Sequence, residues 1–251
     1  ELDNTLFVVS GDHGIPGMPR AKCNLYDIGC EVALAARWPG KIKAGREVDD
    51  FVNLMDLAPT FCDAGGIDIP PSMTAKSIMP LLTSEVSGQV DAARDFVVTG
   101  RERHVHIARE GMLPYPQRSL RTKDFLYIIN FEPDRWPMGD PKGLDDPATP
   151  APDYEDLAYR TMVAYPDLDA SPTKAWMIHH RQEQDVEPLY ELAFGKRPRE
   201  ELYDLNEDPD YMNNVAYDPA YANVRQSLEE RLLSVLRNQN DPRLMEQPCR
   251  Y

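Results

Sequence analysis

An aspartate and a histidine stand side by side at the end of an apolar run near the first residue. Asp12 and His13 follow "LFVVS" and are flanked by Gly11 and Gly14. On such a tight turn the carboxylate and the imidazole could face one divalent cation, and an oxygen-rich site suits calcium or magnesium. The pair could instead cap a helix or turn. For an isolated Asp-His-Gly, this capping interpretation is favoured over metal binding.

A lysine follows ten positions later, within "PRAKCNLYDIG". Held close to a divalent cation, Lys22 could act as a point-charge clamp for an anionic group such as sulfate or phosphate. The alternative is an ordinary solvated lysine. The neighbouring Arg20 has the same two interpretations, with a surface position favoured.

A second group of basic side chains is concentrated in "TGRERHVHIAREG". The chain has 42 acidic against 27 basic residues and a formal net charge of −15, so a basic cluster stands out. We expect it to line a pocket for an anionic ligand rather than a free surface. Its members are Arg101, Arg103, His104, His106 and Arg109.

The composition limits the classes of function. The strong negative charge argues against nucleic acid as a partner, because phosphate binding needs a basic footprint. No apolar run reaches the roughly 18 residues that a membrane span needs. The four cysteines show no zinc-like spacing, and their spacing does not settle whether a disulfide forms.

The first part of the chain predicts an α/β architecture. Continuous apolar runs at residues 6–9 and 32–36 are typical of strands covered on both faces of a sheet. Residues 49–66, ending in Gly-Gly, have the apolar spacing of a helix, which Pro59 either kinks or restarts. A further turn of helix fits "AKSIMPLL".

From residue 94 the sequence pattern changes to that of an α+β fold. Residues 95–100, 117–122 and 124–132 predict antiparallel strands, the last two joined by a turn at Lys123–Asp124. Residues 133–173 are rich in proline, aspartate and glycine and predict long surface loops with a short helix near 154–162. "EELYDLNEDP" predicts a strand and turn, and residues 219–239 an amphipathic helix with a stripe of Val224, Leu228, Leu232 and Val235. We therefore expect two units, residues 1–93 and 94–251.

The order of these motifs resembles one protein family. "DNTLFVVSGDHG", "AKCNLYDIGCEVALAARWPG", "VNLMDLAPTFCDAGG", "SIMPLL" and "EELYDLNEDPDYMNNVA" follow one another as in the C-terminal half of the type I sulfatases, of the alkaline-phosphatase-like superfamily. Within it, "GIPGMPRAKCNLY", "YPQRSLRTKDFLYIINF" and "ELYDLNEDPDYMNNVAYDP" are most similar to the heparan N-sulfatase (sulfamidase) group. One departure is Lys22, where the human-type sulfamidase has arginine and most other sulfatases have lysine.

The resemblance implies a fold and a set of roles. The fold would be an alkaline-phosphatase-like α/β sheet with flanking helices, followed by a small α+β subdomain with an antiparallel sheet and a terminal helix. Asp12 and His13 would be calcium ligands, and Lys22 would contact the sulfate group. His104 would face the sugar of a sulfated carbohydrate substrate.

The same resemblance implies further site residues and a compartment. Arg103 and His106 would flank His104 on the substrate side. The general acid is not assigned to His104. Sulfatases of this family are periplasmic, secreted or lysosomal, and the same compartments are expected here.

The nucleophile that this family uses is not found in the chain. Sulfatases form a formylglycine from Cys or Ser in a C/S-x-P-x-R motif, and none of Cys23, Cys30, Cys62 and Cys249 begins one. The resemblance therefore implies a C-terminal portion whose partner is the missing N-terminal portion of the catalytic domain. Alone, such a portion would be inactive.

Two other functions are compatible with the residues. A phosphodiesterase or phosphonate monoester hydrolase of the same superfamily would carry the same Asp-His turn and bind a transition metal such as Mn²⁺. A degenerate, non-catalytic module that binds sulfated glycans is the third possibility. It would leave the apolar strand at residues 6–9 uncovered, which native proteins avoid.

Overall fold

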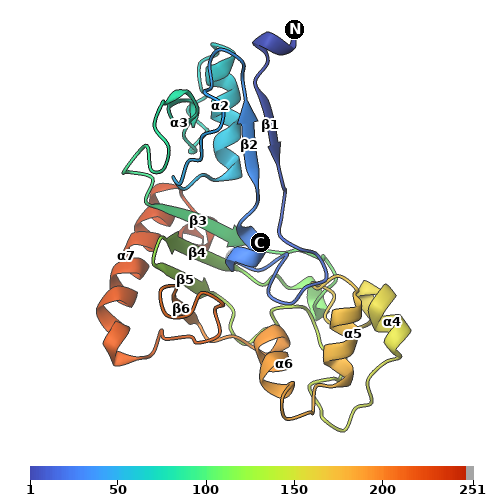
Figure 1. The fold of residues 1–251 in the computed structure, drawn as a ribbon. Helices are drawn as coiled ribbons and strands as arrows, with labels where there is room; N and C mark the ends of the chain where they lie inside the picture. Colours follow the sequence, from blue (N-terminus) through green and yellow to red (C-terminus); the bar gives the residue numbers. More distant parts are fainter. Residues whose placement is uncertain (247–251) are drawn as a thin grey trace.

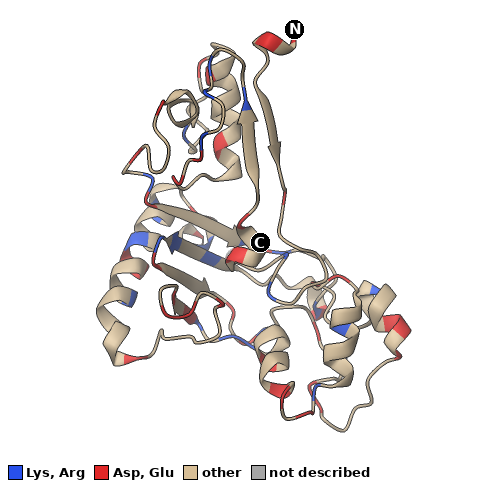
Figure 2. Ribbon diagram, in the orientation of Figure 1, with Lys and Arg blue, Asp and Glu red and all other residues tan. Residues whose placement is uncertain are grey.

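The computed structural model describes residues 1–246. Cys249, which begins no formylglycine motif, lies outside the described residues. Its elements form two sheets and three groups of helices (Figure 1). No helix among residues 1–246 is both long and apolar enough to cross a bilayer. Acidic residues occur on all parts of the ribbon rather than on one element (Figure 2).

The first sheet is a two-stranded antiparallel ribbon. β1 (Phe7–Ser10) pairs with β2 (Leu34–Arg37), with Phe7 opposite Arg37 and Ser10 opposite Leu34. Phe7 and Val9 are 57% and 54% exposed, so the expectation of strands covered on both faces is wrong for residues 1–246. The physical reason is that, within the described residues, β1 and β2 pair only with each other. This leaves the outer edge of each strand and one face of the ribbon open.

Short helices accompany this ribbon. A 3-10 turn, η2 (Leu54–Asp56), continues into α2 (Leu57–Ala64), and α3 (Met79–Thr83) follows. Pro59 lies in the first turn of α2, where its missing N–H breaks no helical hydrogen bond. Asp56 accepts a hydrogen bond from the Lys76 backbone and pairs with Arg94 at 2.9 Å, which ties this segment to the residues before the second sheet.

The second sheet is antiparallel with the order β3-β4-β5-β6. Its strands are β3 (Phe96–Arg101), β4 (Gln117–Thr122), β5 (Phe125–Asn130) and β6 (Glu200–Asp204). These four strands and the turn between β4 and β5 confirm the sequence predictions. The division into units 1–93 and 94–251 stays a prediction.

The long helix α7 (Ala222–Asn238) covers one face of this sheet (Figure 1). Leu228, Leu232 and Leu236 are its buried residues and pack in one cluster with Leu120 and Leu202. The helix confirms the prediction, but Leu236 rather than Val235 completes the buried stripe, because a spacing of four residues keeps to one face.

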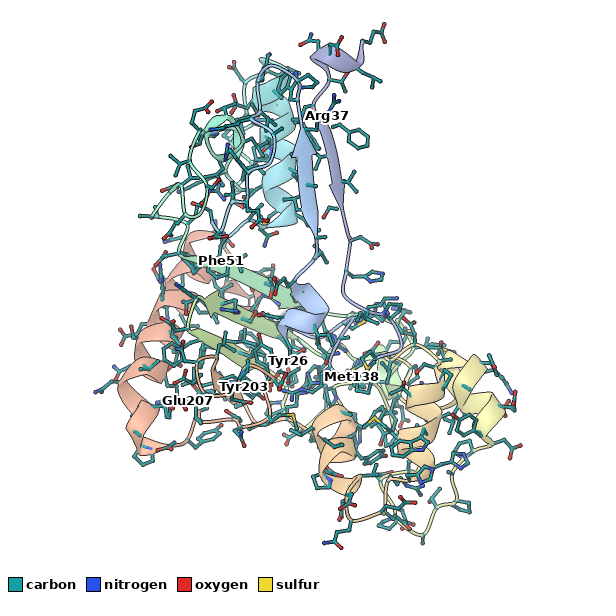
Figure 3. The ribbon with its side chains drawn as sticks, in the orientation of Figure 1. Tyr26, Arg37, Phe51, Met138, Tyr203 and Glu207 are labelled. Atoms are coloured by element: carbon teal, nitrogen blue, oxygen red, sulfur yellow. The ribbon has the colours of Figure 1, made fainter. Side chains whose placement is uncertain are left out.

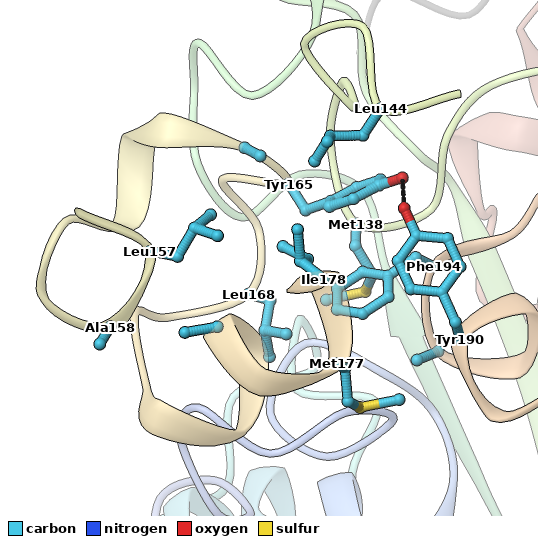
Figure 4. Packing of buried hydrophobic residues seen from close by; sticks show 13 residues of the cluster. Met138, Leu144, Leu157, Ala158, Tyr165, Leu168, Met177, Ile178, Tyr190 and Phe194 are labelled. Carbon is cyan, nitrogen blue, oxygen red and sulfur yellow. Dashed lines mark hydrogen bonds between the residues drawn. The ribbon is translucent and has the colours of Figure 1, made fainter. Parts of the chain in front are cut away.

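Residues 133–199 form a packed layer, so the expectation of mainly surface loops at residues 133–173 was wrong. It contains α4 (Tyr154–Tyr159), α5 (Pro172–His179) and α6 (Glu187–Phe194) around a core of their own (Figure 4). Tyr165 lies at its centre, and its ring centroid is 4.5 Å from that of Phe194. The Tyr165 hydroxyl forms a hydrogen bond with the Tyr190 hydroxyl at 2.7 Å. Only α4 was expected. Residues 174–199, which hold most of α5 and all of α6, carried no prediction, although Tyr190, Ala193 and Phe194 of α6 have helical spacing.

The long connection from β1 to β2 runs down to the second sheet. Leu25 and Tyr26 at its lowest point pack with Leu126, Ile128 and Tyr203 of β5 and β6. Figure 3 shows Tyr26 and Tyr203 beside one another, and their ring centroids are 5.8 Å apart. The remaining short helices are η1 (Leu2–Asn4), α1 (Asp27–Cys30), η3 (Glu110–Met112), η4 (Thr161–Val163), η5 (Pro219–Tyr221) and α8 (Pro242–Met245).

Candidate active site

The loop that carries Lys22 is fixed on both sides. The guanidinium of Arg20 lies 3.9 Å from the Tyr26 ring centroid and donates to the Tyr203 hydroxyl at 3.2 Å. Arg20 is therefore a packed residue, and the favoured surface interpretation was wrong for it. Arg20 and Cys23 both have a left-handed backbone, with φ of 61° and 73°. These two left-handed residues bracket Lys22 in a tight loop.

Lys22 forms an ion pair with a residue that sequence reasoning did not identify. Its ammonium donates to Asp169 Oδ2 at 2.9 Å, and the two side chains are 22% and 31% exposed. This hydrogen bond is the main reason that the pKa of Lys22 is raised above its ordinary value. Asp169 comes from the layer 133–199, 147 residues away in sequence, and a single aspartate in "YPDLDASP" carries no signal of this role.

The turn after β1 presents Asp12 and His13 to solvent. Their side chains are 90% and 41% exposed, with Nε2 of the histidine 3.7 Å from the carboxylate. His13 Nδ1 lies 2.8 Å from the Gly14 carbonyl, which can only accept, so Nδ1 is the donor of this contact and Nε2 is the ring nitrogen that could face a metal. A carboxylate oxygen and a free ring nitrogen are both metal donors.

These two residues do not complete a metal site by themselves. Within residues 1–246 no group of three or more His, Cys, Asp or Glu side chains could hold a metal ion. Calcium takes about 6–8 oxygen ligands, of which the Asp12 carboxylate could supply one or two, whereas the His13 imidazole offers a nitrogen donor of the kind that transition metals prefer. The assignment of both as ligands stays a prediction. Asp12 is near enough to Lys22 to contribute to its raised pKa.

His104 lies within electrostatic reach of Lys22 and Asp169. Partial desolvation is the main cause that lowers its pKa, the charges of Lys22 and Arg101 lower it further, and Asp167 and Asp169 oppose the shift. The charge of Lys22 thus acts on His104, and that of Asp12 acts on Lys22. The imidazole is exposed and is favoured in its neutral form.

The other four basic side chains divide into two pairs. Arg103 and His106 are exposed, and their contact is with each other at 3.3 Å. Their contribution to substrate binding stays a prediction. Arg101 and Arg109 are only 7% and 4% exposed, which excludes a free surface position, and their part in a ligand pocket stays a prediction.

Both buried arginines bind one buried carboxylate. Arg101 and Arg109 approach Asp167 Oδ2 at 2.6 and 2.8 Å. Burial lowers the pKa of Arg101 to about 10, which leaves it charged at neutral pH. The cluster therefore supports the loop that carries His104 from inside.

Known proteins resemble this chain at the level of a family. A family model described as N-sulphoglucosamine sulphohydrolase, C-terminal, matches residues 20–164, more than half of the chain. The chain belongs to this family. It corresponds to a C-terminal portion of a sulfatase, as the order of its motifs predicted.

Two curated sulfatases match almost the whole chain. An ulvan-active sulfatase of Formosa agariphila is 28% identical over 239 residues, which are 95% of this chain and 39% of that protein. N-sulphoglucosamine sulphohydrolase of Homo sapiens is 27% identical over 251 residues, 96% of this chain and 43% of that protein. The chain thus spans about two fifths of the length of these relatives.

Solved structures show the same fold. A protein solved in complex with its substrate D-glucosamine-2-N,6-O-disulfate matches with a TM-score of 0.59 and 20% identity, over 96% of this chain and 36% of that one. The phosphonate monoester hydrolase of Agrobacterium radiobacter matches with a TM-score of 0.51 and 22% identity, over 86% and 31%. Both likenesses concern the fold, and the predicted α/β architecture is confirmed.

Proposed function

We propose that the protein to which this chain contributes its C-terminal portion is a sulfatase that hydrolyses a sulfate ester or sulfamate of a sugar, in the manner of N-sulphoglucosamine sulphohydrolase. The observation that carries the proposal is the partly exposed Lys22 ammonium, paired with Asp169 and within electrostatic range of Asp12 and His104. Family membership and the sulfatase relatives support the same reaction class.

Lys22 would bind the sulfuryl oxygens of the substrate. Its raised pKa keeps it fully charged at any physiological pH, so no proton needs to be taken up before an anion binds. A fixed ammonium at this position would offset the negative charge that develops on the sulfuryl oxygens in the transition state. Asp169 would hold the flexible lysine stem in place.

A metal ion and a formylglycine are implied by the family rather than by residues 1–246. Asp12 and His13 offer two donors that fit a divalent cation, Ca²⁺ in the sulfatase case, together with ligands from the N-terminal portion. When bound, the cation and the formylglycine would supply Lewis acidity and the nucleophile.

His104 would contact the sugar. Because its pKa is lowered, the imidazole is neutral at neutral pH and can both donate and accept a hydrogen bond with sugar hydroxyls. Exposed Arg103 and His106 on the same loop would add donors for further sulfate or carboxylate groups of the carbohydrate.

The N-terminal portion of the catalytic domain is the macromolecular partner that we propose. The uncovered Phe7 and Val9 of β1 support this, because a sheet neighbour and its helices would bury them. A periplasmic, secreted or lysosomal compartment is proposed on family grounds, and one relative is named an extracellular sulfatase.

The test is an assay of sulfate release by the full-length protein. Glucosamine carrying a 2-N- or 6-O-sulfate and an aryl phosphonate monoester would be offered in parallel, with the protein reconstituted separately with Ca²⁺ and Mn²⁺. We expect sulfate release with Ca²⁺. Faster hydrolysis of the phosphonate with Mn²⁺ would assign the chain to the phosphonate monoester hydrolases instead.

A further inference from the structure

One buried carboxylate lies two residues before Asp169 and takes no part in the proposed chemistry. The Asp167 side chain is 0% exposed. Its Oδ2 accepts hydrogen bonds from Arg101 at 2.6 Å and Arg109 at 2.8 Å, and its Oδ1 accepts one from the backbone N–H of Val105 at 2.8 Å. Both oxygens are therefore paired, which a buried carboxylate requires.

The first connection leads to the sugar-side histidine. Val105 follows His104 directly, so the hydrogen bond from the Val105 N–H to Asp167 fixes the backbone on which the imidazole is mounted. The charge of Asp167 also reaches the ring, because it raises the pKa of His104 against the effect of desolvation.

The second connection leads to the sulfate-side lysine. Arg101 bridges Asp167 and the carbonyl of Cys23, to which it donates at 2.8 Å, and Cys23 follows Lys22 directly. The left-handed backbone at Cys23 has a φ of 73° and is held in this form by a contact to its own carbonyl. A change at Asp167 would therefore be transmitted to the position of the lysine stem.

The segment that carries Asp167 is anchored from its other side as well. The ammonium of Lys174, which is fully buried, donates to the Leu168 carbonyl at 2.9 Å. Ser171 Oγ donates to the Gly17 carbonyl at 2.6 Å, within the loop that leads to Lys22. The segment that carries the carboxylate is thus hydrogen-bonded to the loop that leads to Lys22.

We propose that Asp167 is the positioning residue that sets the placement of Lys22, His104 and Asp169 relative to one another. It touches no substrate and acts through Arg101 and the Val105 backbone. This inference rests on the proposed sulfatase function for its kinetic consequence, but its geometric content is independent of the reaction.

The test compares two buried aspartates in the full-length protein. Asp167→Asn keeps the size of the side chain and removes its charge. Asp56→Asn is the matched control, because Asp56 is also buried, pairs with Arg94 at 2.9 Å and accepts a backbone N–H, but lies in the η2 segment. Two readouts are taken from each variant: kcat/KM for the sulfated sugar per folded enzyme, and the pKa of His104 from the NMR titration of its ring proton.

The two variants should differ in both readouts. We expect Asp167→Asn to lower kcat/KM about 10- to 100-fold, as small misplacements of reacting groups do, and to lower the pKa of His104. Asp56→Asn should lower the melting temperature while leaving kcat/KM and the histidine titration as in the wild type. Equal kinetics and an unmoved His104 titration in Asp167→Asn would overturn the proposal.

A milder variant covers the case in which Asp167→Asn does not fold. Arg101→Lys keeps the positive charge but has a single ammonium in place of the fork that joins Asp167, Cys23 and Pro137. We expect a reduced kcat/KM with the pKa of His104 close to that of the wild type, since the Asp167 charge remains. An unchanged kcat/KM would contradict the proposal.

The two proposals can fail separately. If the wild type releases no sulfate while the pKa of His104 responds to Asp167→Asn and not to Asp56→Asn, the positioning role stands and the sulfatase assignment falls. If the wild type is a sulfatase and neither readout responds, only the positioning role falls.

Discussion

Lys22 is the residue on which the proposed chemistry depends most. It could be identified from the sequence because it stands ten positions after the Asp12–His13 pair in a family-like motif. Its partner Asp169 could not, because an ion pair across 147 residues follows from the folded chain and not from local spacing. The same holds for Asp167, whose two arginine partners were interpreted as ligand-binding residues.

Replacing Lys22 should affect turnover far more than folding. We expect Lys22→Ala to lower kcat of the full-length enzyme about 10²- to 10³-fold, the cost of removing one group that stabilises transition-state charge. The partly exposed pair with Asp169 should contribute no more than about 1 kcal/mol to stability. Turnover assays and urea unfolding measure the two effects. Lys123→Ala, in the exposed β4–β5 turn, is the control, and an unchanged kcat in Lys22→Ala would remove the lysine from the site.

The titration of His104 should respond to Asp169. The folded-state pKa of this histidine is below its ordinary value of 6.5, and the Asp169 carboxylate opposes that shift. Asp169→Asn should therefore lower the pKa further, as followed by NMR with His104→Gln for assignment. A rise in the pKa would contradict the placement of the two groups.

The same shift has a consequence for stability. Because the unfolded chain takes up this proton at a higher pH than the folded chain, the contribution of His104 to the free energy of unfolding decreases as pH falls below about 6.5. His104→Gln should flatten that part of the pH profile in urea titrations. A profile steeper than that of the wild type would count against the lowered pKa.

At the scale of elements, the site is held by contacts between the β1–β2 connection and the second sheet. Tyr26 donates to Glu201 Oε2 at 2.6 Å, and Tyr203 donates to the same oxygen at 2.8 Å. Strand β4 could be predicted at its observed bounds and β5 to within two residues, because a polar turn at Lys123–Asp124 separates them and β5 is an apolar and aromatic run. The burial of Tyr26 under the sheet could not, since a loop carries no period that shows which face it meets.

Removing the hydroxyl of Tyr26 should loosen this connection. We expect Tyr26→Phe to reduce the free energy of unfolding by about 1–3 kcal/mol, because a buried carboxylate loses one of its donors. Urea unfolding of the full-length protein measures the change. Tyr217→Phe, at a ring that is 63% exposed, should change stability by less than about 0.5 kcal/mol. Equal effects of the two variants would show that the Glu201 contact contributes little.

At the scale of the whole molecule, the open face of the β1–β2 ribbon is the most unusual feature. The apolar run at residues 6–9 predicted a covered strand, and residues 1–246 do not cover it. The prediction from sequence and the exposure in the structure agree if the N-terminal portion of the sulfatase supplies the neighbour. The C-terminal helix could be predicted from its helical periodicity and the α/β class from continuous apolar runs and the family resemblance, whereas residues 174–199 carried no prediction.

The effect of a Phe7 substitution on stability shows whether β1 is covered in the full-length protein. In the full-length protein we expect Phe7→Ser to reduce the free energy of unfolding by about 1.5–3 kcal/mol, the value of a buried apolar side chain. Val86→Ser is the control, because Val86 is 56% exposed and belongs to a loop. Chemical denaturation of both variants measures the difference. A Phe7→Ser variant as stable as the control would mean that no partner covers this strand.

The ion pair between Lys22 and Asp169 also bears on the order in which the protein folds. Its two ends lie 147 residues apart, and the second end belongs to a layer with its own core. Closing so long a loop is entropically costly, and contacts of large sequence separation form late in folding. We therefore expect the Lys22–Asp169 pair, to which we assign anion binding, to form only after the layer 133–199 has docked. Appearance of sulfatase activity during refolding should consequently lag behind the formation of secondary structure, and activity becomes a reporter of the last assembly step.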